Sequence, residues 1–218
     1  MKNQTVNLEK QMIAVGQNLY TQGLISGSEG NCSVRLNSKH ILITSAGTHK
    51  GFLTRNQILR MDLSGKCLQK KTKLKLSTER FFHLALYQNL KDCLAILHAH
   101  PPFTIALSLA GFDFNQIFLA ETPYALGTIA QLPYTLPSSE KLGAAIGELV
   151  KKSQPKNTIV MQRHGAITFG RNLLDALTAM EILEKTAKIV FLAKALDANL
   201  PMSSADAREL TTHLAGLL

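Results

Sequence analysis

Two kinds of apolar spacing divide this chain into segments. Apolar residues three or four positions apart predict amphipathic helices, and short apolar runs bounded by turn residues predict strands. The predicted helices cover Leu8 to Leu24, Thr78 to Leu90 with Ser77 as N-cap, Pro102 to Gly111, Ser138 or Ser139 to Leu149, Leu173 to Leu196, and a short segment after Pro201. The predicted strands cover Cys32 to Leu36, His40 to Thr44, Ile58 to Leu63, Asp92 to His100, Thr158 to Arg163 and Ala166 to Phe169. Short turns join several of these strands, so we expect a mixed or antiparallel sheet with helices packed against it.

The strand that ends in His98-Ala99-His100 carries the most informative residues of the chain. Side chains alternate between the two faces of a strand, so His98 and His100 point to the same side. Pro101 and Pro102 end the strand directly after them. A histidine on an apolar strand can be a hydrogen-bonded core residue, but two on one face would both need buried partners. The pattern therefore favours a pair of metal ligands at a strand end.

A third candidate ligand is His164, which follows the apolar run from Thr158 to Met161 and precedes Gly165. Three histidines with one open position are typical of a catalytic zinc site rather than a closed structural one. Imidazole also binds manganese, cobalt and iron, so the residues by themselves leave the identity of the metal open.

Three loops of small polar residues could bind an anion. One contains Asn31, the second ends at Gly47, and the third is Ser77-Thr78-Glu79 at a predicted helix start. Glycine lets the backbone approach an anion, and a helix start offers free amide groups. Each loop alone is typical of a turn or a cap, but three in one chain with the histidines favour an anion site.

Glu79 has two interpretations. An acidic residue in the first turn of a helix usually stabilises the helix dipole. The same carboxylate beside a metal could be a ligand or a general acid and base. The remaining histidines have no second candidate ligand near them in the sequence. We interpret them as surface or local capping residues: His40, His49, His83 and His213.

Composition limits the remaining alternatives. A chain of 218 residues is long enough for one large domain or two small ones. No apolar stretch is long enough to span a bilayer, and the polar N-terminus lacks the apolar core of a signal peptide. Three cysteines at unrelated spacings do not indicate a disulfide framework. A reducing cytoplasm is the location that we expect.

The formal net charge of +9 calls for a negatively charged partner. Part of the charge lies around a predicted turn, in Lys66, Lys70, Lys71, Lys73 and Lys75. No aromatic residues or nucleic-acid motif accompany these lysines, so we interpret them as a solvated strand edge and expect no nucleic-acid partner. The charge also suits an enzyme for small phosphorylated molecules.

An ordered set of motifs gives the chain a family resemblance. The motifs are Gly30-Asn31-Cys32-Ser33-Val34-Arg35, Ile43-Thr44-Ser45-Ala46-Gly47, Ser77-Thr78-Glu79, His98-Ala99-His100-Pro101 and Arg163-His164-Gly165-Ala166. With these, the chain resembles the class II aldolase/adducin family of the fuculose-phosphate aldolase type. The resemblance covers nearly the whole length, which implies one class II aldolase/adducin-like domain over residues 1–218.

The resemblance implies an α/β fold, a single-domain α/β/α sandwich with a largely antiparallel central sheet. It also implies a cyclic homotetramer with active sites at subunit interfaces, and typically zinc. Carried over to this sequence, the metal ligands are His98, His100 and His164, and Glu79 is the catalytic acid/base. The phosphate pocket is lined by Asn31, Gly47, Ser77 and Thr78.

The expected activity is that of a metal-dependent lyase that cleaves a small phosphorylated ketose through a metal-stabilised enediolate. A dehydratase, an epimerase or a decarboxylase on a related sugar phosphate shares the same motifs, and a non-catalytic adducin-like interaction domain is the alternative outside catalysis. Two departures from the family pattern concern the substrate. Ala46 stands where the family usually has Ser or Thr, which removes a hydroxyl from the phosphate loop, and the segment from Leu214 to Leu218 lacks the tyrosine of the fuculose-phosphate aldolase tail. Tyr124 is the nearest candidate for another family tyrosine, the one that protonates the aldehyde fragment.

Overall fold

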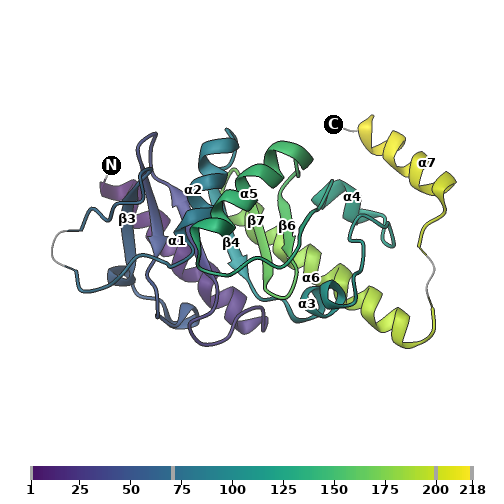
Figure 1. Ribbon diagram of the computed structural model, residues 1–218, viewed down its shortest axis with the longest axis horizontal. Coiled ribbons are helices and arrows are strands. Elements are labelled where there is room, and N and C mark those ends of the chain that lie inside the picture. The colour runs from purple at the N-terminus through teal and green to yellow at the C-terminus, as the bar shows by residue number, and fades with distance from the viewer. Residues whose placement is uncertain (1, 70–71, 199–200, 217–218) are drawn as a thin grey trace.

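A single seven-stranded sheet forms the centre of the computed structural model, which describes residues 2–69, 72–198 and 201–216 (Figure 1). Its strand order is β3-β2-β1-β4-β7-β6-β5. The strands are β1 (Asn31–Arg35), β2 (His40–Thr44), β3 (Ile58–Asp62), β4 (Ala95–Ala99), β5 (Ala130–Leu132), β6 (Thr158–Met161) and β7 (Gly165–Gly170). Neighbouring strands are antiparallel except β5 and β6, which are parallel. The sheet is therefore largely antiparallel, as predicted.

Helices cover both faces of this sheet. The α-helices are α1 (Lys2–Thr21), α2 (Arg80–Asn89), α3 (Pro102–Leu109), α4 (Glu121–Leu126), α5 (Glu140–Ser153), α6 (Leu173–Ala195) and α7 (Ser204–Ala215), with short 3-10 helices η1 (Lys50–Phe52) and η2 (Arg55–Gln57). Helices α2 and α5 pack together on one face, and α1, α3 and α6 lie on the other (Figure 1). Two hydrophobic clusters result, one between each helix layer and the sheet. This arrangement confirms the predicted α/β/α sandwich.

Alternation along β4 explains both clusters. Ala95, Leu97 and Ala99 belong to the cluster under α1 and α6, whereas Ile96 faces α2 and α5. By the same parity, His98 points to the α2 side, where the Phe82 ring lies 5.6 Å from its ring centre. Strands β1 and β7 pair with β4 on its two sides. The first residues of β1 and β7 therefore lie beside the last residues of β4, at the same end of the three strands as His98.

Several elements differ from their predicted bounds. Helix α1 begins at Lys2, well before Leu8, and the predicted strand from Asp92 to His100 is shortened to β4. Helix α4 and strand β5 were not predicted, because β5 has only three residues and α4 only six. The predicted terminal helix is confirmed as α7, which stands apart from the sandwich in Figure 1.

Two predictions about charged and capping residues can also be compared with the structure. The residue at the N-cap position of α2 is Glu79, not Ser77. Lys66, Lys73 and Lys75 are exposed, and Lys66 and Lys73 lie beside β3, an edge strand of the sheet, which agrees with the interpretation as a solvated edge. Lys70 and Lys71 lie outside the described residues.

All three cysteines are free thiols, and no helix among the described residues is long and apolar enough to cross a membrane.

Candidate metal and anion site

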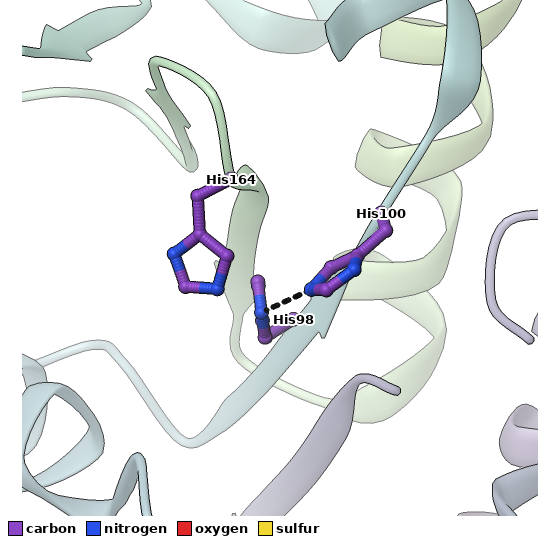
Figure 2. Close-up of side chains that lie close together, drawn as sticks. All are labelled: His98, His100 and His164. Carbon is purple, nitrogen blue, oxygen red and sulfur yellow. Dashed lines mark hydrogen bonds between the residues drawn. The ribbon is translucent and has the colours of Figure 1, made fainter. Parts of the chain in front are cut away.

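The first two histidines lie at the end of strand β4. His98 is completely buried at its end, and His100 lies just past the strand, where its backbone N–H donates to the Leu24 carbonyl. Their side chains share a face, as the alternation predicts, and the two Nε2 atoms are 3.1 Å apart. Figure 2 shows both rings from the same strand pointing toward one another.

His164 reaches the same point from the turn between β6 and β7. Arg163 adopts a left-handed conformation with φ of 62°, and His164 follows it. Gly165 permits the close approach of this turn to β4, because a Cβ there would lie 2.3 Å from the Ala99 carbonyl oxygen. The three imidazole rings consequently converge, with ring centres 4.7–5.3 Å apart (Figure 2).

The geometry of the three rings fits one metal ion. One ligand nitrogen from each histidine lies within 4.8 Å of the others. Two nitrogens that each stand about 2.0–2.1 Å from a common zinc ion are about 3 Å apart, close to the separation of the two Nε2 atoms of His98 and His100. His98 Nδ1 donates to the Ala166 carbonyl at 2.9 Å, which leaves the lone pair on Nε2. The triad is therefore positioned to bind a divalent metal.

The surroundings keep these rings suited to a ligand role. Burial, followed by the nearby His98, lowers the pKa of His164 to about 4. Burial likewise lowers the pKa of His100, whose Nδ1 lies 3.6 Å from Glu29 Oε1. Neutral imidazoles offer a free lone pair at neutral pH. His164 Nδ1 is buried and has no hydrogen-bond partner among the residues that the structure describes.

Glu79 lies directly against the histidines. Its Oε2 is 3.1 Å from His98 Nε2, and its Oε1 is 3.3 Å from His164 Nε2. Asn31 Nδ2 donates to Oε2 at 2.9 Å. Burial alone would raise the pKa of this carboxyl, but attraction to His98 and His164 in their protonated forms, together with the Asn31 hydrogen bond, outweighs burial and holds the pKa well below its usual range. Although Glu79 occupies the N-cap position of α2, its side chain makes no capping hydrogen bond.

A buried chain of hydrogen bonds leads from Glu79 into the core. Because the carboxylate can only accept, Asn31 Nδ2 donates to it, and Asn31 Oδ1 accepts from His83 Nε2 at 2.5 Å. Neutral His83 then accepts at Nδ1 from Ser33 Oγ at 2.7 Å, and Ser33 Oγ accepts from the Tyr87 hydroxyl at 2.8 Å. Every donor in the chain thus points toward Glu79.

The interpretation of His83 as a surface or capping residue is wrong. The residue is completely buried, and burial lowers its pKa to about 3. A signal was present in the sequence: Glu79, His83 and Tyr87 are spaced four residues apart, which places them on one face of a helix. This shared spacing, rather than His83 alone, indicates the buried cluster.

A pocket of about 270 Å³ opens beside the carboxylate. All four residues predicted for the phosphate pocket line it, together with Glu79, His100 and His164: Asn31, Gly47, Ser77 and Thr78. Thr78 Oγ1 is hydrogen-bonded to Ser138 Oγ at 2.8 Å, so the start of α5 closes one side. Sequence reasoning missed Glu29, Lys50 and Ser138 in the lining. Tyr124 lines a different groove, with Lys156.

Comparisons with known proteins agree with this geometry. The family model for the Class II Aldolase and Adducin N-terminal domain matches residues 10–191. The chain is 34% identical over 184 residues to a 3-oxo-tetronate 4-phosphate decarboxylase of Haemophilus influenzae, covering 83% of this chain and 85% of that protein. It is 31% identical over 184 residues to an L-fuculose phosphate aldolase of Methanocaldococcus jannaschii, covering 84% and 96%.

A solved structure gives the same answer for the fold. The crystal structure of YgbL from Escherichia coli, described as a candidate aldolase/epimerase/decarboxylase, superposes with a TM-score of 0.85 at 27% identity and covers 94% of this chain and 98% of that one. Class II aldolases use a divalent metal, and His98, His100 and His164 are positioned to hold one. Fold, sequence and site together show that the chain belongs to the class II aldolase and adducin family.

Proposed function

We propose that this protein is a metal-dependent lyase that cleaves a carbon–carbon bond in a small phosphorylated ketose, as an aldolase does. The observation that carries the proposal is the meeting of three histidines and an ionised carboxylate beside one pocket, which Glu79, His100 and His164 line. That pocket also has the backbone and hydroxyl donors suited to an anion. The L-fuculose phosphate aldolase relative supports this substrate class.

In the proposed site, His98, His100 and His164 hold the metal, and zinc is the ion that we expect from three imidazole ligands. A divalent cation bound there would polarise the substrate carbonyl and stabilise the enediolate left by cleavage. His98 is fixed in the required tautomer by Ala166, and His100 is oriented by Glu29.

Glu79 is the proposed acid/base. Because its carboxyl is ionised, it can accept the proton of the substrate hydroxyl as the carbon–carbon bond breaks, and it can return that proton to the enediolate carbon. Asn31 holds one carboxylate oxygen through its amide. The proposed phosphate ligands Gly47, Ser77 and Thr78 lie in the same pocket and would fix the other end of the substrate.

Decarboxylation is the second candidate, favoured by the 34% identity to a 3-oxo-tetronate 4-phosphate decarboxylase. Loss of carbon dioxide from a 3-oxo acid with a hydroxyl on carbon 2 leaves the electron pair of the broken carbon–carbon bond in an enediolate of the same kind. The same residues would then be used, with Glu79 needed only to deliver a proton to carbon. The two activities therefore differ in the leaving fragment rather than in the site.

Turnover of a substrate panel separates these candidates. Metal-loaded protein would be incubated with ketose phosphates and a phosphorylated 3-oxo sugar acid, and the products identified by mass. An aldolase splits the substrate into two smaller carbon compounds, and a decarboxylase releases carbon dioxide. A dehydratase removes water from the substrate, and an epimerase leaves its mass unchanged. Absence of any product would contradict the catalytic proposal in favour of an interaction domain.

Metal analysis tests the ligand assignment independently of turnover. The His98→Ala, His100→Ala double variant should lose the stoichiometric metal of the wild type, because only one proposed ligand remains. His213→Ala, a change to an exposed histidine on α7, is the matched control and should leave metal content unchanged. Full metal content in the folded double variant would show that the ion is held elsewhere.

A further inference from the structure

Lys50 is a buried lysine in the lining of the pocket. The residue is the first of η1 and is only 4% exposed. The ammonium donates to two backbone carbonyls, Thr48 O at 2.6 Å and Ser28 O at 3.2 Å. Among the residues that the structure describes, no Asp or Glu oxygen lies within 4.0 Å of Nζ. Lysines are almost never buried without a counter-charge, so this one calls for a ligand.

The position of Lys50 is fixed by close packing. Helix α1 lies against η1 at Gly16, where a Cβ would come within 2.3 Å of the Lys50 carbonyl oxygen. The Tyr20 ring of the same helix packs against Gly51 in the same way. Helix α1 therefore fixes the backbone at Lys50. Lys50 lines the proposed substrate pocket together with Gly47 and Ser77.

The other charges of the pocket do not neutralise Lys50. Glu79 is engaged by Asn31 and the histidines, and Glu29 accepts from the backbone and hydroxyl of Ser26 and faces His100. Burial lowers the pKa of Lys50, and the neighbouring Cys32 acts in the opposite direction. Burial raises the pKa of the Cys32 thiol to about 12, so the thiol is uncharged at neutral pH and is no counter-ion for Lys50. Lys50 therefore lines the pocket with no carboxylate among the described residues close enough to form an ion pair with it.

We propose that Lys50 is an anion-binding residue that contacts the phosphate of the substrate. The inference rests on the proposed function, and it names the residue that would make the pocket select a phosphate over a neutral group. Lys50 follows the loop in which Ala46 removes a hydroxyl from the family's phosphate cradle. An ammonium next to this loop offsets the missing donor, because hydrogen bonds from a charged donor are the stronger kind.

Calorimetric titration of the metal-loaded protein with inorganic phosphate tests the assignment. Lys50→Met keeps the stem and removes the charge, and it should weaken phosphate binding about 10- to 100-fold, the loss typical of one charged hydrogen bond. Lys39→Met is the matched control. Lys39 is exposed in the β1–β2 turn, at the opposite end of these strands from Asn31 and Thr44, and its loss should change binding little. Ala46→Ser in the Lys50→Met background should recover part of the affinity.

A second measurement does not depend on the folding of any variant. Acetic anhydride labelling of the wild type, read out by peptide mass, should modify Lys50 more slowly in the presence of phosphate, while Lys39 stays equally reactive. Equal labelling of Lys50 with and without phosphate would overturn the assignment, and so would unchanged phosphate affinity in folded Lys50→Met.

These outcomes separate the two proposals. If Lys50→Met binds phosphate like the wild type and sugar phosphates are still turned over, the Lys50 assignment fails and the proposed function stands. If the wild type neither binds phosphate nor turns over any sugar phosphate, the proposed function fails and the assignment fails with it.

Discussion

At the scale of single residues, the Glu79 carboxylate contacts two histidines and Asn31 but caps no helix. Glu79→Gln keeps the shape and removes both the charge and the ability to take up and return a proton. We expect kcat to fall roughly 10²–10⁴-fold, the usual contribution of a general acid/base. Metal content should survive, because the three histidines remain. The measurement is kcat beside melting temperature and metal content.

A neighbouring substitution provides the control for this prediction. Glu29→Gln removes another carboxylate from the same pocket, one that faces His100 rather than the proposed reacting carbon. This substitution should lower the affinity for the metal more than it lowers kcat of the metal-loaded enzyme. Near-normal kcat in folded, metal-loaded Glu79→Gln would make Glu79 a structural residue and require another acid/base.

His83 gives the protein a defined sensitivity to acid. Its pKa is about 3 in the fold against 6.5 for an ordinary histidine, because it is buried. Between these values the unfolded chain binds a proton that the folded chain does not, so the free energy of unfolding decreases as pH falls from about 6.5 toward 3. His83→Gln should reduce proton uptake on unfolding by about one in this range.

Urea unfolding of metal-depleted protein at a series of pH values measures this effect. The exposed His213→Gln is the control and should leave the pH dependence of the free energy of unfolding unchanged. Wild-type and His83→Gln curves that run parallel from pH 6.5 to 3 would show that His83 is protonated in the fold.

How far the site could be predicted depends on whether a residue's role is visible locally. His98 and His100 share a strand face within three residues, so alternation alone brings their side chains together. Lys50 could not be recognised in the same way. Its burial results from the packing of α1 against η1, and its lack of an ion pair within the described part of the chain depends on the folded positions of distant residues.

At the scale of elements, the turn between β6 and β7 is pressed against the end of β4 through Gly165. Gly165→Ala would place a Cβ 2.3 Å from the Ala99 carbonyl oxygen and force the two strands apart at the histidines. We expect a loss of about 1–3 kcal/mol in the free energy of unfolding, the usual cost of overpacking. Metal affinity should fall too, because His164 moves with the turn.

Gly147→Ala is the matched control for this substitution. A Cβ at Gly147, on helix α5, would meet its nearest neighbours at 3.6 and 3.7 Å, which is ordinary contact. Alanine also forms helix more readily, so the free energy of unfolding should hold or rise by up to about 1 kcal/mol. Urea unfolding and zinc titration compare the pair. Equal stability of both variants would show that the turn is loosely held.

Elements with regular periods could be predicted, and those that depend on partners could not. The strands β1 and β2 follow from apolar runs around a tight turn, where the Asn37 side chain accepts from the Lys39 and His40 amides. Strand β5 has only three residues and exists because it pairs in parallel with β6. No local period marks so short a segment, and its pairing depends on the folded position of β6.

At the scale of the whole molecule, the predicted homotetramer with interface active sites stays a prediction, as does the cytoplasmic location. Exposed apolar side chains are available for such an assembly: Phe52, Leu109, Tyr134, Leu136, Leu174, Phe191, Leu192 and Leu196. We expect light scattering to give a mass about four times the 23.9 kDa of one chain. A monomeric mass at micromolar concentration would contradict the prediction.

The place of His98 within the sheet has a consequence for how the protein would acquire the proposed metal ion. Strand β4 is held by a hydrogen-bonded ladder on each side, to β1 and to β7, so the ligand-bearing strand is ordered by the fold itself. In small zinc-dependent domains, much of the binding free energy is consumed in ordering the chain. Here that free energy remains available as affinity. Removal of the ion should leave the far-ultraviolet circular dichroism unchanged, and the rate of metal exchange should be limited by breaking ligand bonds rather than by opening the chain.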